Sequence, residues 1–509
     1  MKTAMSRPAR WRVATLLVVH LLIAAHIMHW RLNGTSLSSI QLSDAGRFAA
    51  EGVVTAALLL FVLLLAVTAV FGRFFCAWGC HMLALQEVCR LLLGRLGIRP
   101  RPIHSRIFWI FPLGLAAYVF FFPMLERAWL GGTHPSVRLQ LTSGNLWANL
   151  PGPSEGIAIA LVGGLAMVYL LGSLSFCRYL CPYGALFALA DKVAPGRIRL
   201  AGECDGCARC TAACTTGTRV HEEVQRLGMV ASSGCMRCLE CVSACPLQVL
   251  TYGFGRPALL AGSRVGLTRY GLSLGEEGAM AAVFASSFLA LHGLYGAFPL
   301  LVSLAVSLVV SFAAVIALRI VRQPLVSFRG IVLKRRGRLS APGALFVGAA
   351  AVSLLFVSHS LLIQYYQRSA AAALAALGFP HLRPSYSSGE QQLARAAAAE
   401  LELCSRFGLH DTVDWNMHLA WAYRALAEPA LVEQHLRRAI EIDPGQPEPH
   451  FNLAKELDRR GRHAEAVAQF GEAVRLAPTL APFVPIRTRL SAVGITPDFP
   501  QSAGRIPRR

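Results

Sequence analysis

The sequence is short of charged residues, and acidic ones are the scarcest. Only 15% of its 509 residues are Asp, Glu, Lys or Arg, whereas 54% are hydrophobic, and the mean hydropathy is +0.48. This balance excludes an ordinary soluble protein and favours membrane spans. Lys and Arg total 49 against 28 acidic residues. Basic loops between spans explain that excess better than nucleic-acid binding, so no nucleic-acid partner is expected.

The motifs of common enzymes are also missing. No nucleophile–base set, phosphate-binding loop or dinucleotide fingerprint occurs, because GLYG (293–296) and GSRVG (262–266) are too short to count. A hydrolase or a kinase therefore has no support. The N-terminal stretch MKTAMSRPARWRVATLLVVHLLIAA has no small-x-small cleavage site followed by polar residues. We interpret it as a retained first helix and not as a signal peptide.

Apolar runs predict a polytopic membrane protein of about seven spans. The runs are residues 13–30, 52–71, 107–124, 157–176, 280–297, 299–318 and 342–364. The basic segments precede the first span, join the second to the third, and join the sixth to the seventh. The positive-inside rule then places the N-terminus in the cytoplasm and the C-terminal region in the periplasm of a bacterial inner membrane. Only YGAF separates spans five and six, so a single re-entrant hairpin is the competing interpretation.

The predicted fold class is mainly α, with an inserted ferredoxin-like α+β domain and a C-terminal helical repeat domain. The boundaries follow composition and motifs. They give a membrane domain (1–199), a cytoplasmic cluster domain (200–255), further spans (256–365), a linker and helix (366–410), repeats (411–480) and a tail (481–509).

The repeat domain is predicted from a constant sequence offset. Residues 419–444 align with 453–478 at 34 residues throughout, matching several small residues and the closing Pro444 and Pro478. This is the period of tetratricopeptide repeats, which bind peptides or proteins on a concave surface. We therefore expect a protein partner here. A helix within 390–410 would complete the stack.

Eight cysteines form two runs of the pattern C-x2-C-x2-C-x3-C. The runs are CDGCARCTAAC (204–214) and CMRCLECVSACP (235–246). In two-cluster ferredoxins three cysteines of one run bind a [4Fe–4S] cubane and the fourth ligates the other cubane. Two [4Fe–4S] clusters are predicted, the first held by Cys204, Cys207, Cys210 and Cys245 and the second by Cys214, Cys235, Cys238 and Cys241. Such clusters transfer single electrons, so the function is expected to be redox.

A second kind of cysteine motif closes two apolar runs. FCAWGCHMLALQ (75–86) and FCRYLCPYGALF (176–187) each place two cysteines four residues apart. If the segments stay helical, each pair lies on one helix face, and Pro182 opens a new helical segment. We predict a metal site or redox relay at Cys76, Cys80, Cys177 and Cys181. Soft thiolates suit Cu(I), zinc or an iron–sulfur cluster, and the pairs could also cycle as dithiol and disulfide. Arg73 and Arg178 would favour thiolate.

GRFFCAWGC, FCRYLCPYGAL and the paired ferredoxin runs, in this order with spans between, resemble the membrane polyferredoxins of the NapH, NosR and CcoG/FixG types. The resemblance covers about residues 12–255. It implies electron transfer across or out of the membrane, from quinol in some members, and copper reduction during oxidase assembly in one. This chain departs from the group in three ways. We see no flavin-binding domain before the first span. The repeats stand in place of an immunoglobulin-like end, and the first pair reads Cys-x3-Cys-His, with His81, where Cys-x3-Cys-Pro is typical.

Histidines inside spans are costly, so each suggests a role. His26, His29, His292 and His359 lie late in outward-running spans and would collect near the periplasmic face. They could ligate a b-type haem, bind a quinone or quinol, or hold copper. Hydrogen bonding to backbone or lipid headgroups is the simpler interpretation.

The leading hypothesis is therefore a membrane-bound iron–sulfur electron-transfer protein between cytoplasmic clusters, the membrane and a periplasmic partner. One alternative is a copper reductase for metalloenzyme maturation. Another is a redox-sensing scaffold, which would carry no sustained electron flux.

Overall fold

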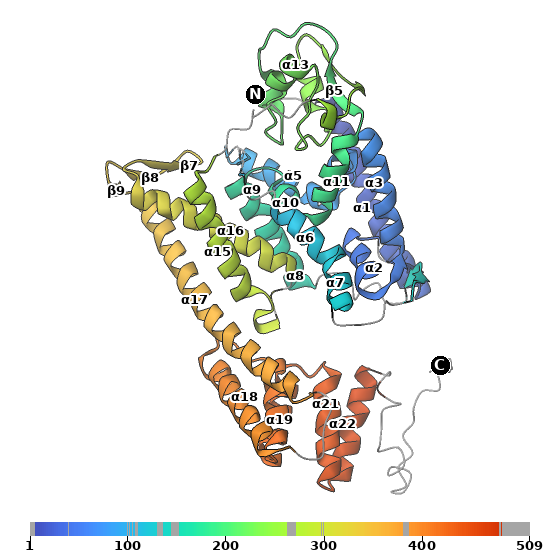
Figure 1. Ribbon diagram of the computed structural model, residues 1–509, viewed down its shortest axis with the longest axis vertical. Coiled ribbons are helices and arrows are strands. Elements are labelled where there is room, and N and C mark those ends of the chain that lie inside the picture. The colour runs from blue at the N-terminus through green and yellow to red at the C-terminus, as the bar shows by residue number, and fades with distance from the viewer. Residues whose placement is uncertain are drawn as a thin grey trace. The chain divides into compact units, whose positions relative to one another are not determined.

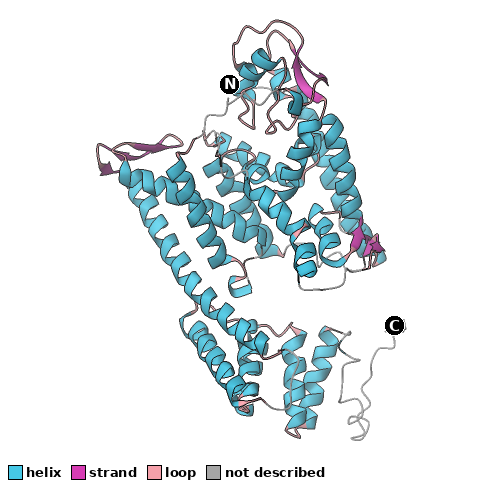
Figure 2. Ribbon diagram, viewed as in Figure 1, coloured by secondary structure: helices cyan, strands magenta, loops and turns pink. Residues whose placement is uncertain are grey.

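The computed structural model describes residues 6–38, 40–98, 100, 102–103, 105–106, 110–129, 136–143, 152–261, 271–296, 298, 300–379, 386–477 and 480. It is mainly helical, as expected (Figure 2). The chain divides into two compact units. The first comprises Met1–Phe288 and Leu300–Ser353, and the second comprises Leu289–Pro299 and Leu354–Arg509. The predicted tail, residues 481–509, lies outside the described part.

Four described helices are long and apolar enough to cross a membrane, judged by length and composition alone. They are α1 (Arg7–Asn33), α15 (Leu274–Leu291), α16 (Leu300–Arg322) and α17 (Ala341–Ala376) (Figure 1). Both α15 and α16 meet this criterion separately, although the sequence left open a single hairpin. Helix α17 runs twelve residues past the predicted end of the seventh span at residue 364.

The other three predicted spans are shorter or bent. Helix α3 (Ala56–Phe71) has 16 residues, about 24 Å of helix, which falls short of a bilayer core of about 30 Å. It starts late because β2 (Val53–Thr55) pairs in parallel with β3 (Arg138–Gln140), and the Thr55 side chain then caps the helix.

The third predicted span is a bent pair, α6 (Ile110–Phe120) and α7 (Phe122–Trp129), at 43°, and Pro123 accounts for the break. Residues 107–109 of this prediction lie outside the described part. The fourth combines α8 (Pro153–Ala158), a π-helical segment (Ile159–Ala166) and α9 (Met167–Leu171). Counting the bent pair, five segments meet the criterion. Seven spans remain a prediction.

The ferredoxin-like domain is built around a short antiparallel sheet. Strand β5 (Gly196–Leu200) pairs with β6 (Leu250–Phe254), so the domain begins before the predicted boundary at residue 200. Three short helices lie between the strands, α12 (Arg209–Ala213), α13 (Val220–Leu227) and α14 (Glu240–Ser243). Ile198, Val220, Val224, Val230 and Leu250 form the core beneath them.

Smaller elements complete the first unit. Strand β1 (Ser36–Leu37) pairs with β4 (Thr142–Ser143), and α2 (Arg47–Glu51) follows a 3₁₀ turn (Leu42–Gly46). The paired cysteines lie in or directly before four helices, α4 (Phe74–Trp78), α5 (His81–Arg95), α10 (Ser175–Tyr179) and α11 (Pro182–Val193). A three-stranded antiparallel sheet joins α16 to α17 and consists of β7 (Val326–Phe328), β8 (Ile331–Arg335) and β9 (Arg338–Leu339).

The second unit contains two helix pairs that repeat. The first pair is α19 (Val413–Ala425) and α20 (Pro429–Ile442), and the second is α21 (Pro447–Arg459) and α22 (His463–Leu476). Corresponding helices begin 34 residues apart, as the sequence offset predicts. Helix α18 (Ser388–Phe407) packs against α19 and extends the array. The matched small residues Ala420, Ala439, Ala454 and Ala473 are almost fully buried, so they allow the helices to approach closely.

Helix α18 begins with a capping box, which gives a local test. The Ser387 hydroxyl accepts from the Glu390 amide, and the Glu390 carboxylate accepts from the Ser387 amide. Replacing Ser387 by alanine should destabilise α18 by about 1 kcal/mol. Hydrogen exchange of the first-turn amides would show this as faster exchange. Ser405→Ala, at an exposed site near the other end of α18, should leave those amides unchanged.

Candidate metal centres

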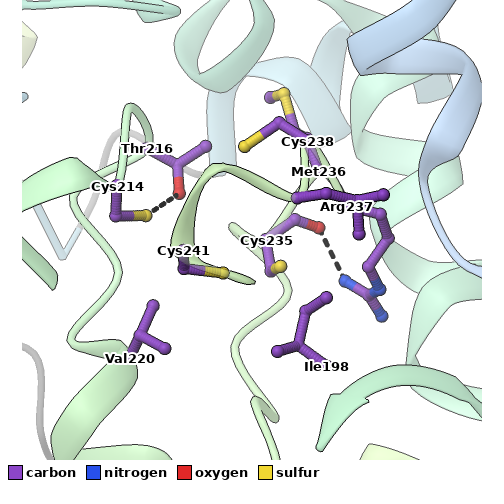
Figure 3. A pocket seen from close by; sticks show the side chains of 10 residues that line it. Ile198, Cys214, Thr216, Val220, Cys235, Met236, Arg237, Cys238 and Cys241 are labelled. Carbon is purple, nitrogen blue, oxygen red and sulfur yellow. Dashed lines mark hydrogen bonds between the residues drawn. The ribbon is translucent and has the colours of Figure 1, made fainter. Parts of the chain in front are cut away.

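The four cysteines predicted for the second cluster line one pocket (Figure 3). Cys235, Cys238 and Cys241 come from the second run, and Cys214 reaches the same space from the first run. Ile198, Val220, Met236 and Leu239 supply an apolar lining. A shielded pocket with four thiols converging from two loops is the donor set that a cubane requires. The residues present therefore fit a [4Fe–4S] cluster.

The cysteines predicted for the first cluster lie closer to the surface. Cys210 is buried, Cys204 and Cys245 are half-buried, and Cys207 is exposed. Cys245 and Cys210 pack in the same apolar core, although 35 residues separate them in the chain. Cys241 of the second set belongs to that core as well, so the two predicted sets lie side by side.

Both cysteine runs have the same backbone. The residue after the second cysteine of each run, Ala208 or Leu239, has a positive φ of 57° or 64°. A short helix begins at the next residue and carries the third cysteine in its first turn. Left-handed backbone at non-glycine residues is uncommon, and its occurrence at equivalent positions indicates that the loops are shaped to direct their thiols.

Burial raises the pKa values of Cys235, Cys238 and Cys241, so these three free thiols hold their protons more tightly. It raises the pKa of Cys238 to about 11 and the pKa of Cys241 well above its ordinary value. Because metals bind thiolate, cluster insertion must release these protons and is favoured by higher pH. The Cys214 sulfur also lies 3.2 Å from the Thr216 hydroxyl, and hydrogen bonds to cluster sulfurs influence reduction potential.

The ferredoxin-like domain docks through polar contacts on the helix ends that carry the paired cysteines. Its backbone carbonyls accept hydrogen bonds from three side chains. Arg73 donates to Ser233 (2.8 Å), Trp78 to Arg237 (3.1 Å) and Arg178 to Thr216 (2.9 Å). In return, the Tyr252 hydroxyl donates to the Phe71 carbonyl at 2.9 Å. Arg12 of α1 also pairs with Glu240 at 3.3 Å.

A buried charge cluster lies beneath this contact, and our sequence reasoning missed it. Asp191, at the end of α11, is fully buried and pairs with Arg237 at 2.8 Å and with Arg197 at 3.7 Å. Arg237 lies between two cluster cysteines and also donates to the Cys235 carbonyl at 2.7 Å. An acidic residue closing the apolar run PYGALFALADKV was the only available signal.

The two Cys-x3-Cys segments fold as structural copies of each other. Before each one, an apolar helix ends at a glycine with positive φ, Gly72 at 81° or Gly172 at 98°. A five-residue helix follows, α4 or α10, and holds the first cysteine. The second cysteine, Cys80 or Cys181, is then the N-cap of the next helix.

This arrangement corrects one expectation. The condition that each segment stays helical fails, because the chain turns between the two cysteines of each pair. Cys80 has extended φ and ψ of −86° and 121°, and Cys181 has −74° and 110°. Pro182 opens α11 as predicted, and His81 takes the equivalent first position of α5, where it is exposed.

The pairs lie together at the junction with the second cluster. Cys76 and Cys177 are both buried at 7% exposure in one apolar cluster, against which Cys80 also packs. Cys238 of the second cluster set packs against that same apolar cluster. Cys181 packs against the neighbouring core and accepts from the Gly184 amide at 3.2 Å. Arg73 Nη2 lies 4.0 Å from the Cys76 sulfur. A Cβ atom placed on Gly184 would lie 3.5 Å from the same Arg73 Nη2.

Three of the four predicted histidines bond a local partner through the imidazole ring. His26 bonds the Leu37 carbonyl at 3.1 Å and His29 the Ser36 hydroxyl at 3.1 Å, which holds the end of α1 against β1. The His359 imidazole bonds the Phe407 carbonyl at 2.9 Å, whereas the hydrogen bond at His292 involves its backbone carbonyl, which accepts from the Gln364 side-chain amide at 3.0 Å. Two belong to each unit. Within the described ranges, no three His, Cys, Asp or Glu side chains are placed to hold a single metal ion.

Comparison with protein families identifies both kinds of cysteine motif. A 4Fe-4S dicluster domain model matches residues 197–246. A 4Fe-4S binding domain model matches twice, at residues 53–99 and 156–200, so each copy contains one Cys-x3-Cys segment. The chain is therefore an iron–sulfur protein, and these two domain matches support [4Fe–4S] clusters as its cofactors.

Of the curated relatives, YccM has a name that describes electron transport, and the names of the others described below state no function. The chain is 26% identical over 212 residues to Escherichia coli (strain K12) YccM, whose name describes an electron transport protein, covering 40% of this chain and 57% of YccM. It is 29% identical over 174 residues to Paracoccus denitrificans NirI, covering 33% of this chain and 24% of NirI.

An uncharacterized Methanocaldococcus jannaschii protein, MJ0750, is 22% identical over 220 residues, covering 41% of this chain and 83% of MJ0750. No solved structure matches the chain. This chain thus spans 57% or less of YccM and NirI, and its similarity to them is that of a shared iron–sulfur region.

Proposed function

We propose that this protein is a membrane-bound electron carrier. Electrons would pass between the two clusters of the ferredoxin-like domain and a redox site formed by Cys76, Cys80, Cys177 and Cys181. The observation that carries the proposal is the contact between these sites. Cys238 of the second set packs against the apolar cluster that contains Cys76 and Cys177.

The hydrogen bonds at the junction support a fixed electron path. Arg73 lies beside Cys76 and also holds the Ser233 carbonyl, two residues before Cys235. Trp78, two residues after Cys76, holds the carbonyl of Arg237. The same side chains therefore position both redox sites. A cubane supplies one-electron chemistry when bound, while the protein fixes its position and excludes water.

The four paired thiols are proposed to hold a soft-metal centre. They belong to two copies of a 4Fe-4S binding domain, so an iron–sulfur cluster is the first candidate. Quinol in the membrane would supply or accept electrons at this end. The candidate spans and the shorter apolar helices support a membrane location, and we propose that this membrane is the bacterial inner membrane. A b-type haem or copper at the four histidines remains a prediction from sequence.

The helical array of the second unit is proposed to bind the partner that exchanges electrons with this protein. Two pairs at a 34-residue offset, with α18 stacked beside them, support tetratricopeptide character. Placement in the periplasm follows from the positive-inside rule.

A copper reductase is the second candidate, and the same thiols favour it. Cys76, Cys177 and Cys80 lie in or against one buried apolar cluster, and thiolates bind Cu(I) preferentially, so two of these thiols could take one Cu(I) ion. Metal analysis of the anaerobically purified protein distinguishes the two candidates. Iron beyond that of two cubanes supports the electron carrier with a third cluster, whereas copper lost on removing the pairs supports the reductase.

The proposal is tested by replacing Cys76 and Cys177 with serine. The variant should keep the spectra of the two ferredoxin-like clusters but lose most of its quinol-driven cluster reduction in vesicles, on the order of 100-fold in rate, because the path is interrupted. The matched control is Cys89→Ser, which removes a buried thiol outside the set. Wild-type reduction rates in the double variant would exclude the relay.

A further inference from the structure

The sheet between α16 and α17 carries several basic side chains and few acidic neighbours that could neutralise them. Between Glu277 and Glu390 the sequence contains no Asp or Glu. Within this stretch Arg319 pairs with Glu276 at 2.5 Å, and Lys334 donates to the Ile320 carbonyl at 2.6 Å. Arg335, Arg336 and Arg338 are all exposed, and no ion pair within the described ranges neutralises them.

Two tight turns form this sheet, and each has the dipeptide Arg-Gly. Arg329 and Gly330 have φ of 52° and 87°, and Arg336 and Gly337 have 48° and 81°. Two-residue turns with both φ positive are type I′ hairpins, for which Asn-Gly is preferred. Arginine in left-handed backbone is uncommon, and such positions often reflect function.

In the first turn, contacts within the protein account for the arginine. Arg329 donates to the carbonyls of Tyr169 and Leu170 at 3.0 and 3.1 Å, at the end of α9. The second turn has no such explanation, because the Arg336 side chain is exposed.

Apolar side chains surround the cations. One face of the sheet is buried through Val326 and Leu333, whereas Ile331, Val332 and Leu339 are 41%, 42% and 49% exposed. The sheet joins two candidate membrane helices directly, so it must lie at a membrane surface if they span. Alternating cations and apolar groups at that depth match the headgroup layer of a bilayer.

We propose that the β8–β9 turn binds the phosphate of anionic phospholipid headgroups through Arg335, Arg336 and Arg338. The inference rests on the membrane location proposed above, and it is independent of the clusters. An anionic lipid fits better than an acidic protein, because the exposed apolar side chains accompany the cations and two candidate spans flank them.

The test counts lipids bound to the full-length protein. Protein is reconstituted with phosphatidylcholine and phosphatidylglycerol, and the lipids it retains are measured by native mass spectrometry. Wild type should retain phosphatidylglycerol preferentially, and less so at high salt. The variant Arg335→Ser/Arg336→Ser/Arg338→Ser should lower the ratio of phosphatidylglycerol to phosphatidylcholine roughly tenfold or more.

A charge-matched control replaces three exposed arginines of the second unit, Arg395, Arg406 and Arg475, with serine. It should keep the wild-type ratio. A second variant, Arg336→Asn, supplies a residue that type I′ turns prefer, so it should fold like wild type and still lower the ratio. Iron content should be unchanged in every variant, which separates this test from the proposed electron transfer.

An unchanged ratio in the triple variant would overturn the proposal, as would an equal loss in the control. Displacement of phosphatidylglycerol by inorganic phosphate alone would show a free-anion site and also overturn it. A bound acidic protein lost from the triple variant, with the lipid ratio unchanged, would identify the other class of partner.

Discussion

Replacing Cys214 with serine is expected to remove the second cluster and to leave the first. Cys214 adjoins the first cysteine run in sequence, yet its sulfur lines the pocket formed by Cys235, Cys238 and Cys241. A serine oxygen is a poor ligand for iron compared with thiolate. Iron should fall by roughly one cubane per chain, and the low-temperature EPR signal of one cluster should disappear.

Matched variants identify which cluster is lost. The Cys214→Ser spectrum should resemble that of Cys238→Ser and differ from that of Cys204→Ser. Cys404→Ser, which removes a fully buried thiol of the second unit, should leave both signals intact. If Cys214→Ser resembles Cys204→Ser instead, each run binds its own cluster and the exchange of fourth ligands is wrong.

The second large effect is expected from Asp191→Asn. Asp191 is the carboxylate that the buried guanidinium of Arg237 contacts at 2.8 Å, with Arg197 at 3.7 Å. All three side chains have no exposed surface in these ion pairs. Neutralising the acid leaves two cations in a low-dielectric interior, and breaking such a pair costs about 3–5 kcal/mol.

The loss of stability in Asp191→Asn should appear where the ferredoxin-like domain docks. Arg237 also donates to the carbonyls of Gly196 and Cys235, so its displacement disturbs both the first strand and a cluster loop. The temperature at which cluster absorbance bleaches should therefore drop clearly. Glu222→Gln, which breaks a half-exposed pair with Arg219 in the same domain, should change stability by at most about 1 kcal/mol. Equal bleaching temperatures for Asp191→Asn and wild type would refute a stabilising role.

The sequence predicted the local features well because they depend on nearby residues. Apolar runs gave helices, the 34-residue offset gave two matching helix pairs, and Pro182 opened α11. It did not predict the turn between the two cysteines of each pair. A spacing of four is compatible with a helix, and only the geometry of α4, α5, α10 and α11 shows that the chain turns there.

The length of a predicted span also depended on strand pairing with a segment distant in sequence. The run 52–71 is predominantly apolar, yet its first residues form β2 because Arg138–Gln140 lies beside them. The resulting α3 is too short to meet the length criterion. A local pattern cannot show a partner more than eighty residues away.

By itself, the sequence determined the type of chemistry and predicted the grouping of the cluster cysteines, since thiols at fixed short spacing restrict the chemistry to metals or redox. Tertiary structure decided which sites lie together. It placed Cys238 against the apolar cluster that contains Cys76 and Cys177, and it buried Asp191 between two arginines. Both arrangements join segments remote in sequence. Burial and charge pairing act through space, so no spacing along the chain could reveal them.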